Sequence, residues 1–419
     1  MKKTFFSIVV CGLFTIVLTA QQIGVSAEVR PRFENKHGYK TLFNTNQKGS
    51  NFISQRTRLS LVFTQDNLKM GVSFQNVRVW GDVSTLSAND KANSLHEAWA
   101  QYLVSDQFSL KFGRQEIVYD DSRIFGNVGW AQQARSHDAV LAKISFKKHS
   151  KLDLGFALNS DSQSGADVLY SNAAGYKTFQ YAWYHTQLKD VGLSLLVLNT
   201  GVEFLETSTE QKVNYSQTIG GRATFKKGNF NFDASTYFQS GKLQANSISA
   251  TYFGGNAKYK ASDLFSLGLG GEYLSGKDTN DASSKIKSFN PIFGTNHKFN
   301  GWMDYFYVGN HLGNVGLIDV YASITYKKDK FSAKLVPHLF SSSANIYNGD
   351  TKMDDSLGTE IDFTIGYKIS KNINFNAGYS KMFATNSMEF LIGGDKNENN
   401  SWAWMMFTFK PTLFSSATR

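Results

Sequence analysis

The segment "LGTEIDFTIGYKI", residues 357–369, alternates strictly between two classes of side chain. Its odd positions read Leu, Thr, Ile, Phe, Ile, Tyr and Ile, and its even positions read Gly, Glu, Asp, Thr, Gly and Lys. Because successive side chains of a β-strand point to opposite faces, this pattern predicts a strand with one apolar and one polar face. The same alternation runs through 151–159, 230–239, 315–327 and 372–380.

Extended along the chain, the alternation predicts about 18 strands of roughly 10 to 14 residues each. We place them at 22–34, 54–65, 68–80, 94–105, 107–119, 137–148, 151–160, 176–187, 191–201, 214–226, 229–241, 247–260, 264–275, 314–327, 330–341, 358–369, 372–384 and 401–413.

The connections between these strands alternate between short and long. Tight turns are expected at Asp66-Asn67, Ser105-Asp106, Lys189-Asp190, Lys227-Gly228, Lys328-Asp329 and Ser370-Lys371, and longer polar loops at 35–53, 81–93, 120–136, 160–175, 276–313 and 385–400. A soluble β-sandwich would mix its loop lengths and need a dry core between two sheets. An outer-membrane barrel combines an even strand count, short periplasmic turns, long outer loops and an apolar face toward lipid. We therefore predict an all-β fold, a transmembrane antiparallel β-barrel of about 18 strands.

The start of the chain indicates export. Residues 1–20 contain Lys2 and Lys3, then the apolar run 5–18, and end at the small residue Ala20, which is typical of a secretory signal peptide. Cys11, the only cysteine, lies within it, so we expect no disulfide or thiol chemistry in the mature chain. Only four prolines occur and no linker divides the rest, so residues 21–419 are predicted to be one barrel domain. No later apolar run approaches the ~18 residues of a transmembrane helix.

The charge of the chain limits its partners. The net charge of +10 falls by two when Lys2 and Lys3 are removed, and so stays positive. A basic surplus suits nucleic acid, an acidic membrane surface or an anionic solute. Export argues against nucleic acid, so we expect an anionic solute and outer-membrane lipid as partners.

Eight of the ten arginines fall between residues 30 and 135. Four of them alternate with apolar or small residues and are predicted to face the lumen: Arg30, Arg32, Arg56 and Arg58. Arg78 and Arg114 share the parity of Phe74 and Phe112, which have the pattern of lipid-facing residues. Bulges near Asn76 and at Gly113 are therefore expected to turn both arginines inward.

The last two of these arginines, Arg123 and Arg135, lie in the loop 120–136 and near the start of the next strand. The carboxylates of the same region are Glu28, Glu34, Glu97, Glu116, Asp120, Asp121 and Asp138. We expect Arg114, Arg123 and Arg135 to lie inside the barrel or at its outer mouth. Each is expected to pair with a nearby carboxylate, namely Glu116, Asp120, Asp121 or Asp138. One interpretation of the whole set is a structural network of arginine–carboxylate pairs. The other is a selectivity surface, since the screening length of about 8 Å is comparable with the radius of a pore.

The stretch "GRQEIVYDDSRIFGNVGWAQQARSHDAV", residues 113–140, resembles the signature of the alginate export family of outer-membrane porins. The matching positions are Gly113, Arg114, Gln115, Asp121, Arg123, Gly126, Trp130, Arg135, Ser136 and Asp138. The resemblance extends from "EVRPRFENKHGYK" to the last strand, with His137 as a departure where the family often has an aromatic residue. It implies an 18-stranded barrel with an electropositive conduit for a polyuronate.

The loop 276–313 is the longest, and its second half is rich in aromatic residues. In one interpretation it is a lid or folds into the lumen and narrows it, with Trp302, Tyr305 and Tyr307 stacking on sugar rings. In the other it is a self-packed outer cap. Trp130 is a further candidate for stacking on a saccharide.

No H-E-x-x-H, G-x-S-x-G or C-x-x-C motif occurs, so we predict no catalytic or metal site. Passive diffusion needs no cofactor, because bore size, wall charge and aromatic side chains carry it. We predict a monomeric porin of the outer membrane for an anionic saccharide or another small anion. The alternatives are a closed-bore binding or adhesion barrel and, less favoured, an outer-membrane barrel enzyme.

The signal-peptide pattern predicts a mature N-terminus at Gln21. Intact-mass measurement on protein purified from membranes checks this, and a start at Glu28 would show that cleavage follows the second small-residue site, Val25-Ser26-Ala27.

Overall fold

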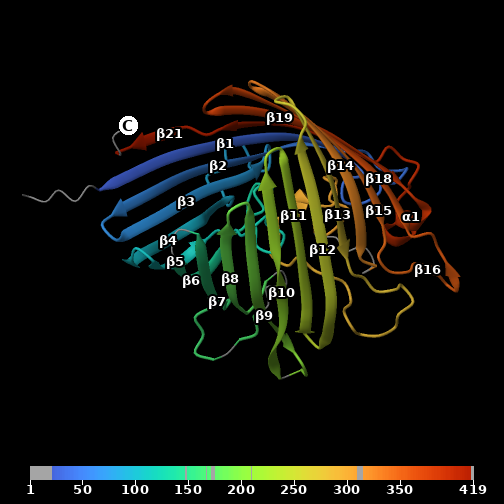
Figure 1. Ribbon diagram of the computed structural model, residues 1–419, viewed down its shortest axis with the longest axis horizontal. Coiled ribbons are helices and arrows are strands. Elements are labelled where there is room, and N and C mark those ends of the chain that lie inside the picture. Colours follow the sequence, from blue (N-terminus) through green and yellow to red (C-terminus); the bar gives the residue numbers. More distant parts are fainter. Residues whose placement is uncertain are drawn as a thin grey trace, which may run out of the picture.

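The computed structural model describes residues 21–146, 149–166, 168–170, 175–208, 210–308 and 315–416. The signal peptide predicted at 1–20 lies outside these residues. The described residues form a closed barrel of 18 antiparallel strands, as predicted (Figure 1). The last barrel strand is interrupted at Lys410 and Pro411 and is labelled in two parts, β20 and β21.

The barrel strands are β1 (Gln22–His37), β2 (Ser50–Gln65), β3 (Leu68–Val79), β4 (Asn93–Ser105), β5 (Phe108–Gln115), β6 (His137–Phe146), β7 (Ser150–Leu158), β8 (Thr178–Leu188), β9 (Val191–Leu205), β10 (Gln211–Lys227), β11 (Phe230–Leu243), β12 (Asn246–Lys260), β13 (Phe265–Leu274), β14 (Leu317–Lys328), β15 (Phe331–Ser341), β18 (Ser356–Ser370), β19 (Ile373–Ala384), β20 (Ser401–Phe409) and β21 (Thr412–Ser415).

The first and last strands close the ring. β1 pairs with β2 on one side and with β20 and β21 on the other, in a register that runs from His37 opposite Ser401 to Gly24 opposite Ser415. A closed barrel has no free edge, so each strand hydrogen-bonds to a neighbour on both sides.

The two ends of the barrel differ, as the sequence predicts. The short-turn end carries the tight connections, such as Asp66-Asn67 between β2 and β3, and the long-loop end carries loops such as 275–316. The long loops contain small elements that the alternation does not predict: the hairpin β16 (Tyr347–Asn348) and β17 (Thr351–Lys352), the helix α1 (Asn386–Ile392) and the 3-10 turn η1 (Asn296–Lys298). In the described parts of the chain, no helix is both long and apolar enough to span a membrane.

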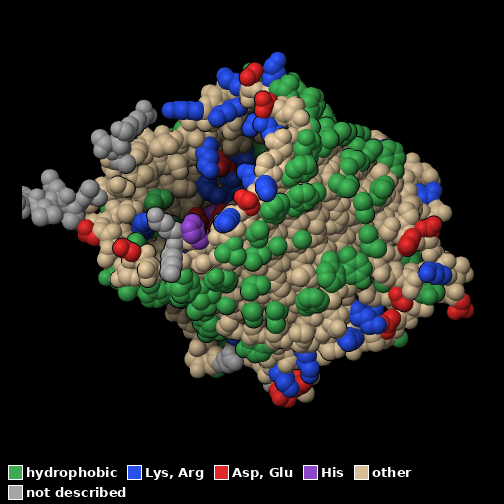
Figure 2. Space-filling model, in the orientation of Figure 1, with side chains coloured by type: hydrophobic (Ala, Val, Ile, Leu, Met, Phe, Trp, Pro, Cys, Tyr) green, Lys and Arg blue, Asp and Glu red, His purple; other side chains and the backbone are tan. Residues whose placement is uncertain are grey.

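The two faces of the wall follow the alternation of the sequence. In β18, Ile361 and Phe363 are 38% and 44% exposed on the outside, whereas Glu360 and Asp362 are fully buried on the inside. Figure 2 shows hydrophobic side chains spread over the outer wall, with basic and acidic side chains inside an opening. An apolar outer belt around a closed ring of strands is the arrangement that a bilayer requires.

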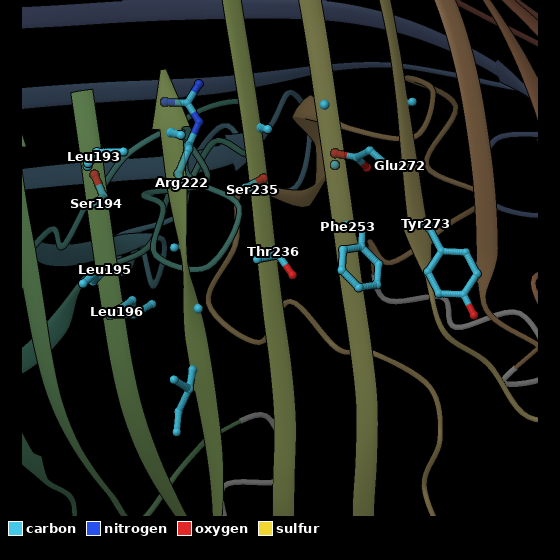
Figure 3. A pocket seen from close by; sticks show the side chains of 18 of the residues that line it. Leu193, Ser194, Leu195, Leu196, Arg222, Ser235, Thr236, Phe253, Glu272 and Tyr273 are labelled. Carbon is cyan, nitrogen blue, oxygen red and sulfur yellow. The ribbon is translucent and has the colours of Figure 1, made fainter. Parts of the chain in front are cut away.

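A hollow of 1100 Å³ lies in the wall of β9–β14. Small outward residues such as Gly221, Gly255 and Gly271 line it between larger apolar ones, including Phe253 and Tyr273 (Figure 3). The lining is almost wholly apolar at its accessible surface, so we assign the hollow to the lipid side of the wall.

The register corrects the prediction for two arginines. Arg78 lies opposite Gln55 and keeps the outward parity of Phe74, because the bulge in this region adds an extra residue to β4 and leaves the register between β2 and β3 unbroken. Arg114 likewise keeps the parity of Phe112, because the pairing of β5 with β6 passes Gly113 without a shift. Both arginines therefore lie on the outer side, toward the long-loop end, and do not line the lumen.

Two long loops, 116–136 and the described part of 275–316, fold into the barrel instead of covering its mouth (Figure 1). Each of the 18 described barrel strands has at least one inward-facing side chain that is buried, from Arg30 of β1 to Trp402 of β20. The inward interpretation of the longest loop is therefore correct for its aromatic segment, and the self-packed outer cap is not.

Arg123 joins the two inward loops to the wall. Its Nη2 donates to Glu272 Oε2 of β13 at 2.7 Å and to Asn300 Oδ1 of the second loop at 3.0 Å. Burial is the largest influence on Arg123 and opposes its charged form, but the surrounding groups, Glu272 foremost, together outweigh burial, and the pKa of Arg123 is raised. The expected pairing of Arg123 with Glu116, Asp120, Asp121 or Asp138 is thus wrong, since its carboxylate partner lies on a strand 149 residues later.

We predict that Arg123→Ala frees both inward loops without unfolding the barrel. Breaking a buried ion pair typically costs about 3 kcal/mol or more, because the remaining carboxylate is left without a partner. Limited trypsin digestion should then cut faster after Arg135 and Lys298, while heat-modifiable gel mobility still reports a folded barrel.

Arg114→Ala is the matched control, because the pair of Arg114 with Asp138 is exposed and contributes about 0–1 kcal/mol. Loss of the folded band in Arg123→Ala alone would show that this arginine maintains the wall as well as the loops. Equal cutting rates in both variants would contradict its role as the link.

Candidate functional site

Three of the predicted lumen arginines bind the first inward loop. Arg30 Nη1 donates to Gly129 O at 2.8 Å, Arg32 Nη1 donates to Trp130 O at 2.7 Å, and Arg56 Nη1 donates to Gln132 O at 3.4 Å. Their side chains are almost fully buried between the wall and this loop. Arginine forks suit this task, since several N–H groups can meet carbonyls that would otherwise be unsatisfied.

Carboxylates of the same region complete these contacts. Glu28 accepts from Arg56 Nε at 2.8 Å, and Glu34 accepts from Arg32 Nε at 3.0 Å. Glu34 also accepts from Trp402 Nε1 at 3.2 Å, which ties β1 to β20. The arginines and carboxylates of β1 and β2 therefore form a structural network of ion pairs and hydrogen bonds, which is the first of the two interpretations given above.

The remaining predicted residues have separate surroundings. Arg58 donates to Gln75, Glu97 accepts from the backbone N–H of Glu116, and Glu116 lies 2.8 Å from His96 Nε2. Arg135 donates to Gly294 O of the second inward loop, and burial lowers the pKa of Arg135 to about 10. No ion pair of Arg135 is seen among the described residues, so its expected carboxylate partner is not found there.

Three of the four aromatic side chains proposed to stack on a saccharide are already engaged. Tyr305 is fully buried and donates to Gly38 O. Tyr307, two residues later in the chain, is also buried. Trp130 lies 4.0 Å from the guanidinium of Arg32 and stacks with His297 at a centroid distance of 4.8 Å. Their assignment to sugar binding is therefore wrong for the two tyrosines in this conformation, and Trp302 is the better candidate.

Trp302 lies at a cavity of 230 Å³ that we call the basic chamber. The chamber lies between the inward loops and the inner face of β10–β15, with lining residues close to the short-turn end, such as Lys258 and Lys334. Its cationic lining residues are Arg222, Lys258, Lys298 and Lys334, and its aromatic ones include Trp302 and Tyr321.

The cations of the chamber differ in how they are neutralised. Arg222 lies 3.3 Å from Asp121 and 3.4 Å from Asp233, so its charge is shared with two carboxylates. Lys258 and Lys334 form no ion pair among the residues that the structure describes. Lys334 Nζ instead lies 5.4 Å from the ring centroid of Trp302. The chamber therefore combines uncompensated positive charge with an aromatic ring.

Sequence reasoning missed these residues, with the exceptions of Asp121 and Trp302. Lys258 and Lys334 do stand on the polar face of predicted strands, which is the one signal that the sequence contains for them. That signal does not separate them from other polar lumen positions, because their grouping depends on which loops fold inward. Among the described residues, no group of His, Cys, Asp and Glu side chains is arranged to hold a metal ion.

Comparisons with known proteins agree with this architecture. The chain resembles the solved structures of Pseudomonas aeruginosa OccK8 (OprE), with a TM-score of 0.61 and 13% identity over 94% of this chain and 98% of that one. It also resembles Pseudomonas aeruginosa OpdO, with a TM-score of 0.62 and 14% identity over 94% of this chain and 98% of that one. The outer membrane protein opdK of the same organism gives a TM-score of 0.59 and 12% identity over 94% of this chain and 99% of that one. These identities establish the fold alone. No curated protein matches the chain.

The model of the family described as alginate export matches residues 21–397, which include nearly all of the barrel and both inward loops. The predicted resemblance is therefore confirmed at the level of the family. The chain belongs to the alginate export family and is a β-barrel porin of the bacterial outer membrane.

Proposed function

We propose that this porin passes anionic solutes, either an acidic saccharide or another small anion, by passive diffusion through the basic chamber. The observation that carries the proposal is the pair of lysines, Lys258 and Lys334, which form no ion pair in the described structure and line one cavity with Trp302. A carboxylate would meet the lysine charges, and the face of a sugar ring would suit the indole. We propose no enzymatic role, and a monomer is sufficient because one chain closes the barrel.

The predicted arginine-lined path needs revision within this proposal. Arg30, Arg32 and Arg56 donate to the first inward loop, and Arg78 and Arg114 lie on the outer side. Positive charge for an anion would therefore come mainly from lysines of β12 and β15 and of the second loop. The arginines contribute to selectivity indirectly, by keeping the first loop in place.

One observation favours the rival proposal of a closed-bore binding barrel. Each of the 18 described barrel strands has at least one buried inward side chain, which is the pattern expected of a bore that is largely filled. A steady current through purified protein in a planar bilayer supports the channel. A barrel that never conducts would instead be a binding or adhesion protein.

The proposal predicts anion preference in reversal-potential measurements under a salt gradient. The double variant Lys258→Gln, Lys334→Gln should lower the anion-to-cation permeability ratio, roughly fivefold if the lost attraction is about 1 kcal/mol. Lys352→Gln, in the exposed hairpin formed by β16 and β17, is the control and should leave the ratio unchanged.

A wild-type preference for cations would contradict the anionic solute. An unchanged ratio in the double variant, with anion preference retained, would place the selective path elsewhere in the barrel.

A further inference from the structure

The inner face of β18 holds a pair of acids under the second inward loop. Glu360 and Asp362 are both fully buried and stand two residues apart, so they lie on the same side of the strand. Glu360 Oε1 accepts the backbone N–H groups of Trp302 at 2.5 Å and Met303 at 2.9 Å. Asp362 Oδ2 accepts from Trp302 N at 3.2 Å. The loop segment 300–303 is therefore held by this acid pair.

Other charged groups surround the pair on each side. From β14 and β15, His338 Nδ1 lies 2.9 Å from Asp319 and its Nε2 lies 3.7 Å from Asp362. From β13, Glu272 is paired with Arg123 and accepts from Asn300 Nδ2 at 2.7 Å. Further groups near the pair are Ser380 of β19, which donates to Asp362, and Lys334 of β15 at the ring of Trp302.

Carboxylates outnumber the cations in this buried cluster. Four acids, Glu272, Asp319, Glu360 and Asp362, face Arg123 and His338. One oxygen, Glu360 Oε2, is buried without a hydrogen-bond partner among the described atoms. A proton on one carboxyl of the pair would reduce the excess of negative charge, because like charges at this spacing disfavour double ionisation.

The second inward loop contacts Glu360 through a turn whose backbone has left-handed φ values. Asn300, Gly301 and Asp304 have φ values of 58°, 80° and 56°, in the left-handed region that favours glycine. A Cβ atom added at Gly301 would lie 2.7 Å from the carboxyl carbon of Glu360. Only glycine allows the backbone to come this close, so the contact depends on both residues.

These contacts couple proton binding to the position of the loop. When both carboxyls are ionised under the loop, two adjacent charges have no access to water, which is unfavourable. If the loop lifts, water can hydrate both of them. A rise in pH that removes the remaining proton therefore favours the lifted loop, and a fall in pH favours the seated one.

We propose that the segment 300–303 is a gate over the basic chamber, held shut by the acid pair Glu360–Asp362 while that pair retains a proton, and released as the pH rises. Trp302 connects the two features, since its backbone N–H binds the acid pair and its side chain lines the chamber. The inference rests on the proposed channel function, because a gate requires a path to close.

The test is bilayer conductance of the full-length porin between about pH 6 and about pH 9, which lies above the ordinary titration of an exposed carboxyl. Wild-type protein should conduct several-fold more at the higher pH. Glu360→Gln keeps an oxygen that accepts the two N–H groups but has no proton to lose, so its conductance should stay low across the range.

Glu203→Gln is the matched control. Glu203 is also a buried glutamate that binds a loop, accepting from Tyr170 N at 2.6 Å, but it stands on β9 and does not line the chamber. This variant should follow the wild-type pH profile. Gly301→Ala should conduct at both ends of the range, because the added methyl group prevents the loop from seating.

Heat-modifiable gel mobility confirms that each variant is folded before it is recorded. A wild-type current that does not change with pH, or a Glu360→Gln variant that opens as the wild type does, would overturn the gate and leave the channel intact. Absence of current from every folded variant at every pH, Gly301→Ala included, would overturn the channel and the gate together.

Discussion

The rest of the structure depends on one constraint, which is that a backbone in hydrocarbon has no water to bond with. The chain meets it by closing the ring through β1 with β20 and β21. Closure leaves apolar side chains on the outside and polar ones on the inside. Any loop that enters the barrel therefore meets polar groups on the wall, and it is held by charged hydrogen bonds rather than by apolar packing alone.

The contacts of the two inward loops follow from that constraint. Arginines of β1 and β2 bind the carbonyls of the first loop, and carboxylates of β13 and β18 bind N–H groups of the second. Both loops also bring aromatic side chains to the interior, where Phe125 of the first stacks with Phe293 of the second at 5.3 Å between ring centroids. The interior thus combines an ion-pair network at the wall with an aromatic core between the loops.

Much of the wall could be predicted from the sequence, and little of the interior. Alternation in 357–369 correctly predicted that Ile361 and Phe363 of β18 face outward, because a strand exposes its faces by simple parity. It failed at Leu357, which is fully buried where the register with β15 shifts. Simple parity also places Arg78 and Arg114 on the outer face, where the structure has them. The prediction that bulges near Asn76 and at Gly113 would turn both arginines inward was wrong. In the pairing of β3 with β4, the extra residue is His96 of β4, in a segment whose sequence has no glycine to mark it.

The interior was less predictable because its contacts join segments far apart in the chain. Nothing in the spacing of Arg123 indicates Glu272, and nothing near Glu360 indicates that Gly301 will lie against it. Tyr305 and Tyr307 of the second loop pack on the protein, and the sequence pattern alone does not distinguish this from stacking on a sugar. Local pattern predicts a strand, whereas the choice of partners inside a barrel depends on the closed shape.

The pairing of Arg123 with a residue 149 positions later also bears on how the protein is assembled. The first inward loop is made between β5 and β6, but its partner arrives only with β13, and the ring closes only with β20. The side chain of Arg123 therefore cannot pair with Glu272 until the chain has been produced as far as β13. Contacts of such long range are late and slow events in folding. The ion pair of Arg123 with Glu272 is therefore expected to form later than the hairpins of the wall, whose contacts are local in sequence.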